Sequence, residues 1–206
     1  MTNMIEVILI RHGKTKGNLR RNYIGRTDEP LCRQGVDELT EKKTAAAYPA
    51  ADMLFVSPLR RCRQTAELLY PGVPAVVVDD LRECDFGEFE NKNYQDLADN
   101  NAYQAWLDSN GESPFPGGES REEFAARCLR GFALAVEKAL AADVRPQRVA
   151  FVVHGGTIMA LLAACTELAY FGAMCGNGCG WRVRLDADIW REEGRLLDPE
   201  PLFGAE

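Results

Sequence analysis

The stretch Val7-Ile8-Leu9-Ile10-Arg11-His12-Gly13 places a histidine directly after an unbroken run of aliphatic residues. The pattern recurs where Val149-Ala150-Phe151-Val152-Val153 leads into His154-Gly155-Gly156. Such continuous apolar runs are typical of strands buried in a parallel sheet. Ligands of open α/β sheets bind at the carboxyl ends of the strands. We therefore expect His12 and His154, the only two histidines of the chain, to face one crevice at that edge.

Strand and helix patterns alternate along the rest of the sequence. Strands are predicted over residues 5–11, 52–56, 75–78, 149–153 and 181–185, and helices over residues 35–48, 58–70, 93–108, 120–141 and 157–165. Pro58 suits the first turn of its helix, and Ser120-Arg121-Glu122-Glu123 forms a capping box. The alternation predicts an α/β fold, namely a three-layer α/β/α sandwich with a mainly parallel sheet.

Length and composition favour a single domain over residues 1–206, because 206 residues with 46% hydrophobic side chains can bury one sizeable core.

Residues 84–119 interrupt the alternation of strands and helices. They are acidic and aromatic, and they end in Pro114-Phe115-Pro116-Gly117-Gly118. We interpret them as a short lid insertion at the ligand-binding edge of the sheet.

Charge and cysteine usage argue against several function classes. The net charge of −7 disfavours general binding to nucleic acids or anionic membranes. No stretch approaches the roughly 20 apolar residues of a membrane span, and the N-terminus does not resemble a secretion signal. Seven scattered cysteines indicate reduced thiols in a cytoplasmic protein. Cys175 and Cys179 lack two further ligands nearby, so we predict no metal. An isologous homodimer is the default expectation for oligomeric state.

Groups suited to a tetrahedral oxyanion gather in three segments. The segment 11–18 offers a guanidinium, an imidazole, a carboxamide and backbone amides freed by Gly13. The segment 57–66 places Arg60, Arg61 and Arg63 at a helix start, where free amides already favour anions. The segment 154–157 runs from a strand through two glycines into a helix, which makes a second anion-binding corner.

A fourth segment, residues 81–90, offers a candidate general acid. Glu83 is followed by aromatic residues that can desolvate it and raise its pKa toward the range useful for acid catalysis. Taken alone, each of the four segments also fits an ordinary role: a loop histidine, a solvated basic face, an acidic surface turn or a packing device. Their combination in one chain favours the functional interpretation.

The order and spacing of the four segments resemble the histidine phosphatase superfamily, which includes the cofactor-dependent phosphoglycerate mutases. The resemblance runs from Arg11 to about Thr157, and residues 23–31 are similar to the stretch that follows the family's first motif. It implies catalytic roles for His12, Glu83, Arg11, Arg61 and His154, and substrate-binding roles for Asn18, Thr27 and Gly155.

In this family the first histidine carries a transient phosphohistidine, so the resemblance implies that His12 is the nucleophile. Arg11, Arg61 and His154 would clamp the phosphoryl oxygens, with Asn18 and the Gly155 amide as further donors. Thr27 would contact the substrate through its backbone. Glu83 would protonate the leaving oxygen and then accept a proton from water. No metal or other cofactor is implied, and the partner is a small-molecule phosphate ester.

The lid composition favours a phosphatase over a mutase. A mutase needs cations to hold a second phosphate, but between Glu83 and Arg121 only Lys92 is basic, and residues 84–120 hold eight acids. The lid aromatics would suit a ring-bearing or partly apolar leaving group; they are Phe86, Phe89, Tyr94, Tyr103, Trp106 and Phe115. We therefore predict a metal-independent phosphomonoesterase that acts on a small phosphorylated metabolite.

Two stretches, residues 85–90 and 116–120, resemble the α-ribazole phosphatase branch, which acts late in cobalamin assembly. Asn91 departs from that pattern, because glycine is usual at this position. α-Ribazole phosphate is therefore one candidate substrate, and related sugar-phosphate phosphatases share much of the pattern. A cofactor-dependent phosphoglycerate mutase and a non-catalytic phosphate-binding regulatory homologue remain as alternatives.

Overall fold

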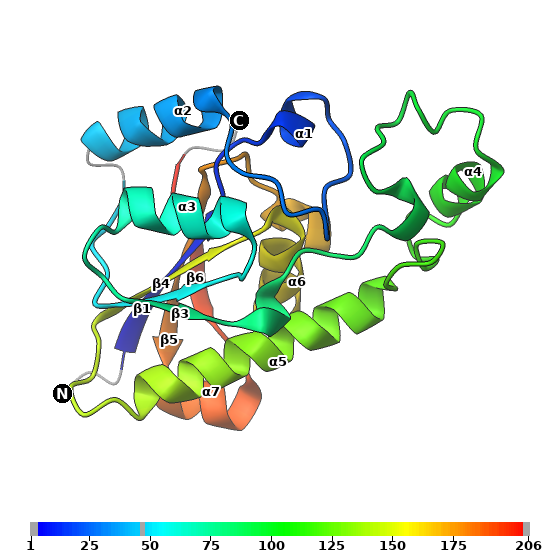
Figure 1. Cartoon of the computed structure of the whole chain (residues 1–206). Helices are drawn as coiled ribbons and strands as arrows, with labels where there is room; N and C mark the ends of the chain where they lie inside the picture. The colour runs from blue at the N-terminus through cyan, green and yellow to red at the C-terminus, as the bar shows by residue number, and fades with distance from the viewer. Residues whose placement is uncertain (1–3, 46–47, 204–206) are drawn as a thin grey trace.

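One six-stranded sheet forms the centre of the computed structural model, which describes residues 4–45 and 48–203 (Figure 1). The strands are β1 (Met4–Arg11), β2 (Met53–Val56), β3 (Ala75–Val77), β4 (Arg148–Val153), β5 (Gly180–Asp186) and β6 (Leu197–Pro201). The helices are α1 (Lys16–Leu19), α2 (Arg33–Thr44), α3 (Arg60–Leu69), α4 (Asn101–Asp108), α5 (Arg121–Leu140), α6 (Gly155–Cys165) and α7 (Ala187–Glu193). Short 3-10 helices are η1 (Asp79–Leu81), η2 (Gly87–Phe89) and η3 (Tyr170–Ala173).

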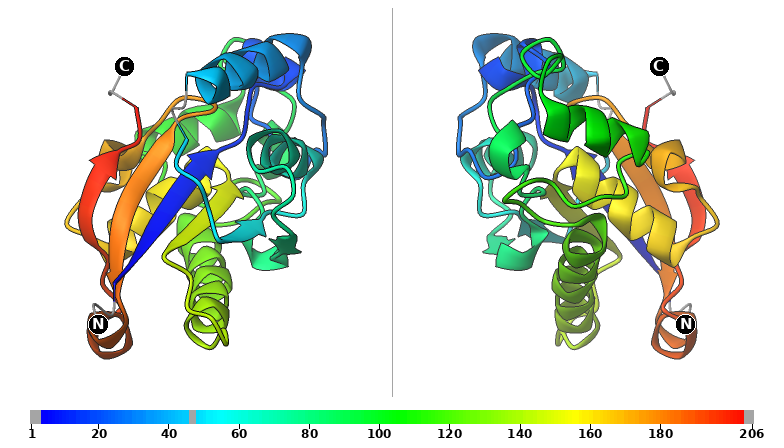
Figure 2. Two further views of the ribbon diagram at one scale, coloured as in Figure 1. Left: turned by 90° about the vertical axis from the view of Figure 1, so that its left-hand side faces the viewer. Right: turned by 90° about the vertical axis from the view of Figure 1, so that its right-hand side faces the viewer.

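The strand order across the sheet is β3-β2-β4-β1-β5-β6, which Figure 2 shows from the side. β3, β2, β4 and β1 are parallel neighbours, whereas β5 runs antiparallel to β1, and β6 antiparallel to β5. The predicted mainly parallel sheet is confirmed. The sequence pattern did not predict α7 or β6, because the Leu-Asp-Pro-Glu-Pro string of β6 has neither an apolar run nor a hydrophobic alternation.

Side chains of β1 alternate between two cores, and this alternation creates the three layers. Ile5, Val7 and Leu9 pack with residues of α5, α6 and α7 on one face. Ile8 and Ile10 pack with residues of α2 and α3 on the other face. Each such buried aliphatic side chain stabilises the fold by roughly 1.5–3 kcal/mol. The predicted α/β/α sandwich is thereby confirmed.

The capping box at the start of α5 forms as predicted. The Ser120 hydroxyl accepts from the Glu123 amide, and the Glu123 carboxylate accepts from the Ser120 amide. Other predicted helix ends were wrong by a few residues. α3 begins after Pro58 rather than on it, α6 begins at Gly155 rather than Thr157, and α2 ends before the predicted limit at residue 48. Residues 46–47 of that predicted helix lie outside the described part of the chain.

The helix predicted over residues 93–108 forms only in its second half, as α4. The Asn93 side chain accepts from the amides of Gln95 and Asp96, and this turn competes with helix formation. Asn100 then accepts from the Tyr103 amide and caps the helix that does form.

No helix in residues 4–45 and 48–203 combines the length and apolarity needed to cross a membrane.

Residues 84–119 leave the sheet edge and return to it, carrying α4 away from the sheet (Figure 1). The two ends of the segment are joined, since the Glu119 amide donates to the Asp85 carbonyl at 3.0 Å and the Glu88 amide donates to the Pro116 carbonyl at 2.8 Å. Phe89, the centre of a small aromatic core within the segment, is fully buried. The segment therefore has a small core of its own, and hydrogen bonds join its two ends where it leaves the sheet.

Asn91, the departure from the usual glycine, has a structural explanation. Its backbone φ is 61°, in the left-handed region that glycine favours and asparagine tolerates better than most residues. Its side-chain amide also donates to the Thr27 hydroxyl at 2.9 Å. The substitution therefore preserves the backbone turn after η2 and adds a contact to the loop that contains Thr27.

Candidate active site

His12 and His154 lie side by side at the carboxyl ends of β1 and β4. Their ring centroids are 5.2 Å apart, with 66° between the ring planes. The strand register explains this proximity, because Arg11 pairs with Val153 and a histidine follows each of them. The two rings are 3% and 0% exposed, respectively. The predicted convergence of the two imidazoles is therefore confirmed.

The hydrogen bonding of His12 determines which ring nitrogen can react. Nδ1 lies 2.8 Å from the carbonyl oxygen of Gly13, and a carbonyl can only accept, so Nδ1 carries the proton. Burial, reinforced by the positive charges of Arg61 and Arg11, holds the pKa of His12 well below its ordinary value. The ring is therefore neutral near pH 7, and its unprotonated Nε2 has the lone pair of a nucleophile.

His154 is oriented by residues at the start of α3. Its Nε2 lies 2.7 Å from the Ser57 hydroxyl and 3.4 Å from the Cys62 sulfur. Burial, followed by the positive charge of Arg61, lowers the pKa of His154 well below its ordinary value. The second ring is thus also neutral and fixed in orientation beside His12.

Two guanidinium groups flank the histidines. Arg61 is fully buried and donates to the carbonyls of Thr27 at 2.7 Å and Gly25 at 2.9 Å. Arg11 donates to the carbonyl of Cys175 at 2.7 Å. The Nε atom of each arginine is buried and has no hydrogen-bond partner among the described residues. Because an unpaired buried donor is unfavourable, each of these two N–H groups is suited to an added acceptor such as an anion.

Glu83 lies beside the start of α6. Its carboxyl group accepts from the amides of Cys84 at 3.0 Å and Gly156 at 3.2 Å. Burial raises the pKa of Glu83 above its ordinary value, although the two amides and the charges of Arg61 and Arg11 act in the opposite direction. A carboxyl group that retains its proton to higher pH suits a general acid.

Asn18 and Gly155 lie close to the other phosphate-binding candidates. The side-chain oxygen of Asn18 accepts from the Thr15 amide at 3.1 Å and from the Asn177 side chain at 3.3 Å, so its NH₂ group is the part suited to an anion. Gly155 begins α6 against Arg11. A Cβ atom at this position would lie only 3.2 Å from the Arg11 Nε, so glycine permits the close approach.

Thr27 lies in a loop whose carbonyl groups accept from Arg61. Its carbonyl accepts from Arg61, and its hydroxyl donates to the Glu90 carboxylate at 2.9 Å. Thr27 does not line the cavity that contains Glu83. The structure therefore gives Thr27 a visible part in holding Arg61, while a direct backbone contact to substrate stays a prediction.

A cavity of about 670 Å³ is walled largely by the lid segment and by residues after α6. Of the predicted site residues, Arg11, Glu83 and Gly155 line it, whereas His12, Arg61 and His154 do not. Its charged lining residues are Arg11, Glu83 and Arg121, and its aromatic lining residues are Tyr23, Phe86, Trp106, Phe115, Phe124, Tyr170 and Phe171. The Arg121 guanidinium lies 3.8 Å from the centre of the Tyr170 ring. The cavity thus combines three charged side chains with a largely apolar and aromatic wall.

The prediction for the lid aromatics needs correction. Of the six, Phe86, Trp106 and Phe115 line the cavity. Phe89 and Tyr103 are buried in the core of the segment itself, and Tyr94 is exposed outside the cavity. Sequence composition does not separate the aromatic residues that face a ligand from those that pack the lid.

The anion site predicted at the start of α3 also needs correction. Only Arg61 of the three arginines is buried, whereas Arg60 and Arg63 are exposed. The Arg60 amide donates to the Asp28 carboxylate at 2.6 Å, so a side chain of the protein itself occupies this helix terminus. Arg61 enters the site through its side chain rather than through the amides of the helix.

The glycine turn between Cys175 and Cys179, which sequence reasoning could not place, lies against the end of β1. The Gly178 amide donates to the carbonyls of Arg11 and His12, at 3.0 and 3.1 Å, and Asn177 donates to the His12 carbonyl at 3.1 Å. The turn therefore fixes the end of β1. No local sequence signal indicated this role, because more than 150 residues separate the turn from Arg11 and His12 in the sequence.

Metal-binding side chains do not cluster in the described part of the chain. No group of three or more His, Cys, Asp or Glu residues in residues 4–45 and 48–203 is placed to hold a metal ion. All seven cysteines are free thiols. The cationic side chains beside the two neutral histidines are Arg11 and Arg61.

Comparisons with known proteins place these features in a family. The sequence profile of the histidine phosphatase superfamily (branch 1) matches residues 7–191. The chain is 30% identical to an adenosylcobalamin/alpha-ribazole phosphatase of Salmonella typhimurium, over 88% of this chain and 86% of that protein. It is also 30% identical to a 2,3-bisphosphoglycerate-dependent phosphoglycerate mutase of Bradyrhizobium sp., over 88% and 92%.

A solved structure supports the same grouping. The alpha-ribazole phosphatase from Shigella flexneri superimposes with a TM-score of 0.75 at 25% identity, covering 87% of this chain and 90% of that one. The fold and the extent of the family match agree over most of the described chain. The chain therefore belongs to the histidine phosphatase superfamily, branch 1, and is an enzyme of the histidine phosphatase type.

Proposed function

We propose that the protein is a metal-independent phosphomonoesterase that works through a phosphohistidine. In the first step, Nε2 of His12 attacks phosphorus, a P–N bond forms, and the P–O ester bond breaks as Glu83 gives its proton to the leaving oxygen. In the second step, the Glu83 carboxylate takes a proton from water, whose oxygen attacks phosphorus. The P–N bond breaks, and neutral His12 and inorganic phosphate are released.

The pair of unpartnered guanidinium N–H groups beside a neutral imidazole is the observation that most supports this proposal. Phosphoryl transfer depends largely on positioning and on stabilising charge at the equatorial oxygens. Arg11, Arg61 and His154 provide donors around His12, and Asn18 and the Gly155 amide are proposed as further donors. The guanidinium groups supply the positive charge that this chemistry needs.

The cavity favours a phosphatase over a mutase. A mutase holds a doubly phosphorylated intermediate while it reorients, and this requires cations for the second phosphate. The cationic side chains that line the cavity are Arg11 and Arg121. Lys92, the basic residue of the lid, instead donates to the Glu88 carbonyl outside the cavity. Most of the remaining wall is apolar or aromatic.

A partly apolar or ring-bearing leaving group is the substrate class that this wall supports. α-Ribazole phosphate, which is of this class, is the specific candidate that we propose. The aromatic lining, with Trp106 and Phe115 from the lid, and the similarity to alpha-ribazole phosphatases both support it.

A panel of phosphomonoesters tests the proposal in metal-free buffer with a chelator present. We expect phosphate release from α-ribazole phosphate and 4-nitrophenyl phosphate, and no turnover by His12→Ala, because that variant lacks the nucleophile. The two monophosphoglycerates, tested with and without bisphosphoglycerate priming, form the comparison arm. Primed interconversion of the monophosphoglycerates that exceeds every hydrolysis rate would instead establish a mutase. Phosphate binding without any turnover would establish a regulatory homologue.

A further inference from the structure

Arg127, on the second turn of α5, is a buried arginine whose five N–H donors all have acceptors. Its Nε and Nη2 donate to the two carboxylate oxygens of Glu119 at 2.8 and 2.7 Å. Its remaining donors reach the main-chain carbonyls of Asp80 at 2.9 Å, Arg82 at 3.1 Å and Glu83 at 3.3 Å. A guanidinium has five N–H groups in one plane, so the side chain is fully satisfied.

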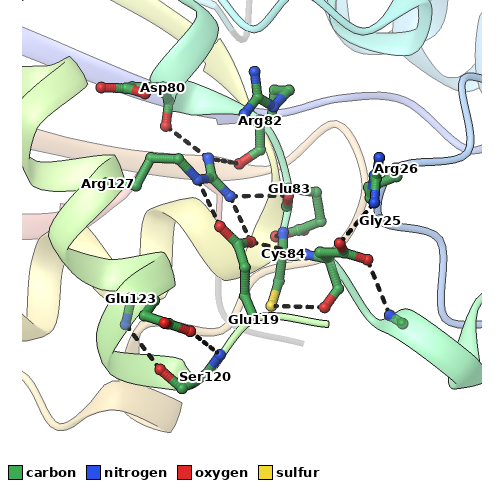
Figure 3. Close-up of polar contacts among 12 residues, drawn as sticks. Gly25, Arg26, Asp80, Arg82, Glu83, Cys84, Glu119, Ser120, Glu123 and Arg127 are labelled. Atoms are coloured by element: carbon green, nitrogen blue, oxygen red, sulfur yellow. Dashed lines mark hydrogen bonds and ion pairs between the residues drawn. The ribbon is translucent and has the colours of Figure 1, made fainter. Parts of the chain in front are cut away.

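The acceptors of Arg127 have a common feature, which Figure 3 shows. They belong to the backbone that leads from η1 into Glu83 and to the residue that closes the lid segment. Glu119 is tied in turn to the other end of the lid, because it accepts from the Asp85 amide at 2.9 Å. Although burial raises the pKa of Glu119, the hydrogen bonds from Arg127 and Asp85 hold it below its ordinary value, so the carboxylate is ionised.

We propose that Arg127, through its ion pair with Glu119, is a positioning residue for Glu83. The inference rests on the proposed function, because Glu83 is assigned there as the general acid. Arg127 does not line the cavity, and all five of its N–H donors already have acceptors within the protein, so none is left for a ligand. It binds the main chain on both sides of the Glu83 side chain: directly at residues 80, 82 and 83, and through Glu119 at residue 85.

This arrangement determines where the carboxyl group of Glu83 lies relative to His12. That carboxyl group accepts hydrogen bonds from two backbone amides, those of Cys84 and Gly156. Within the described residues, no charged side chain forms an ion pair with it. Its position therefore depends on the backbone that Arg127 holds. Lysine cannot replace arginine in this role, because an ammonium group has three donors and no planar fork.

Misplacing a general acid has a kinetic signature that loss of stability does not have. A substrate whose leaving group is a strong base, such as a simple alkoxide, needs the proton during bond cleavage. A substrate with a stable leaving anion, such as 2,4-dinitrophenolate, does not. Damage to Glu83 placement therefore lowers kcat/KM for the alkyl phosphate far more than for the dinitrophenyl ester, because acid catalysis contributes roughly 10²–10⁴-fold.

The experiment measures kcat/KM of both substrates for wild type, Arg127→Lys and Glu119→Gln. Arg130→Met is the matched control, because Arg130 lies on the same helix and pairs with the Asp80 side chain at 3.3 Å while 63% exposed. The ratio of the two kcat/KM values does not depend on the fraction of protein that is folded. A destabilised variant therefore still gives a valid ratio. Glu119→Gln is a second test variant, whose side chain is nearly isosteric with glutamate.

We expect the alkyl-to-dinitrophenyl ratio to fall at least tenfold in Arg127→Lys and Glu119→Gln and to stay within twofold of wild type in Arg130→Met. An unchanged ratio in both test variants, or an equal fall in the control, would overturn the inference. The wild-type protein separates this failure from a failure of the proposed function. If wild type hydrolyses both esters and His12→Ala hydrolyses neither, the phosphatase proposal stands whatever the ratio shows.

Discussion

At the scale of single residues, His12 and Glu83 have pKa values shifted in opposite directions. Burial lowers the pKa of His12 and raises that of Glu83. The proposed mechanism requires a neutral His12 and a protonated Glu83 in the free enzyme, so we expect kcat/KM to rise through the lowered histidine pKa and to fall through the raised carboxyl pKa as pH increases. We predict that the acidic limb of the kcat/KM profile, where activity rises with pH, lies below pH 6.5, the ordinary pKa of histidine. In Glu83→Gln, the fall in kcat/KM at higher pH that Glu83 causes should be absent.

A pH series on wild type and Glu83→Gln with one alkyl phosphate checks this prediction. Ionisation of the substrate phosphate affects both proteins equally, so the difference between the two profiles isolates Glu83. The same alkaline limb in both proteins would show that another group is responsible. The sequence led to both residues and to the expectation that a backbone carbonyl holds the proton of His12. It did not identify that carbonyl as Gly13 or the Ser57 hydroxyl as the partner of His154, since hydrogen-bond geometry has no sequence signature.

At the scale of elements, the turn after η2 depends on a left-handed residue. Asn91 holds a φ of 61°, and an alanine there costs about 1–2 kcal/mol in this conformation, whereas glycine adopts it freely. Both substitutions remove the hydrogen bond to Thr27. We therefore predict that Asn91→Ala unfolds at lower urea concentration than Asn91→Gly, with a difference of about 1 kcal/mol in the free energy of unfolding.

Equal stability of the two variants would contradict this assignment of backbone strain. Element ends could be predicted where capping side chains determine them, as Ser120 and Glu123 do for α5. They could not be predicted where local turns compete with the helix, as at Asn93. The strand β6 escaped prediction because its pairing with β5, rather than its own polar sequence, makes it a strand.

At the scale of the whole molecule, the parallel pairing of β1 with β4 converts two distant sequence motifs into one site. This could be predicted, because buried parallel strands end at a common edge. The turn at residues 175–179 could not, because its partners Arg11 and His12 are distant in sequence and its glycines carry no pattern. Cytoplasmic location, a single domain over residues 1–206 and a homodimer stay predictions.

Trapping the covalent intermediate tests the central claim most directly. Rapid quenching of wild type with ³²P-labelled substrate should yield a phosphoprotein that is stable in base and labile in acid, with the label on His12. His12→Ala should yield none, and Glu83→Gln with the dinitrophenyl ester should accumulate more, because its second step lacks the base. Turnover by wild type with no labelled protein at any time point, or label retained in His12→Ala, would contradict the account.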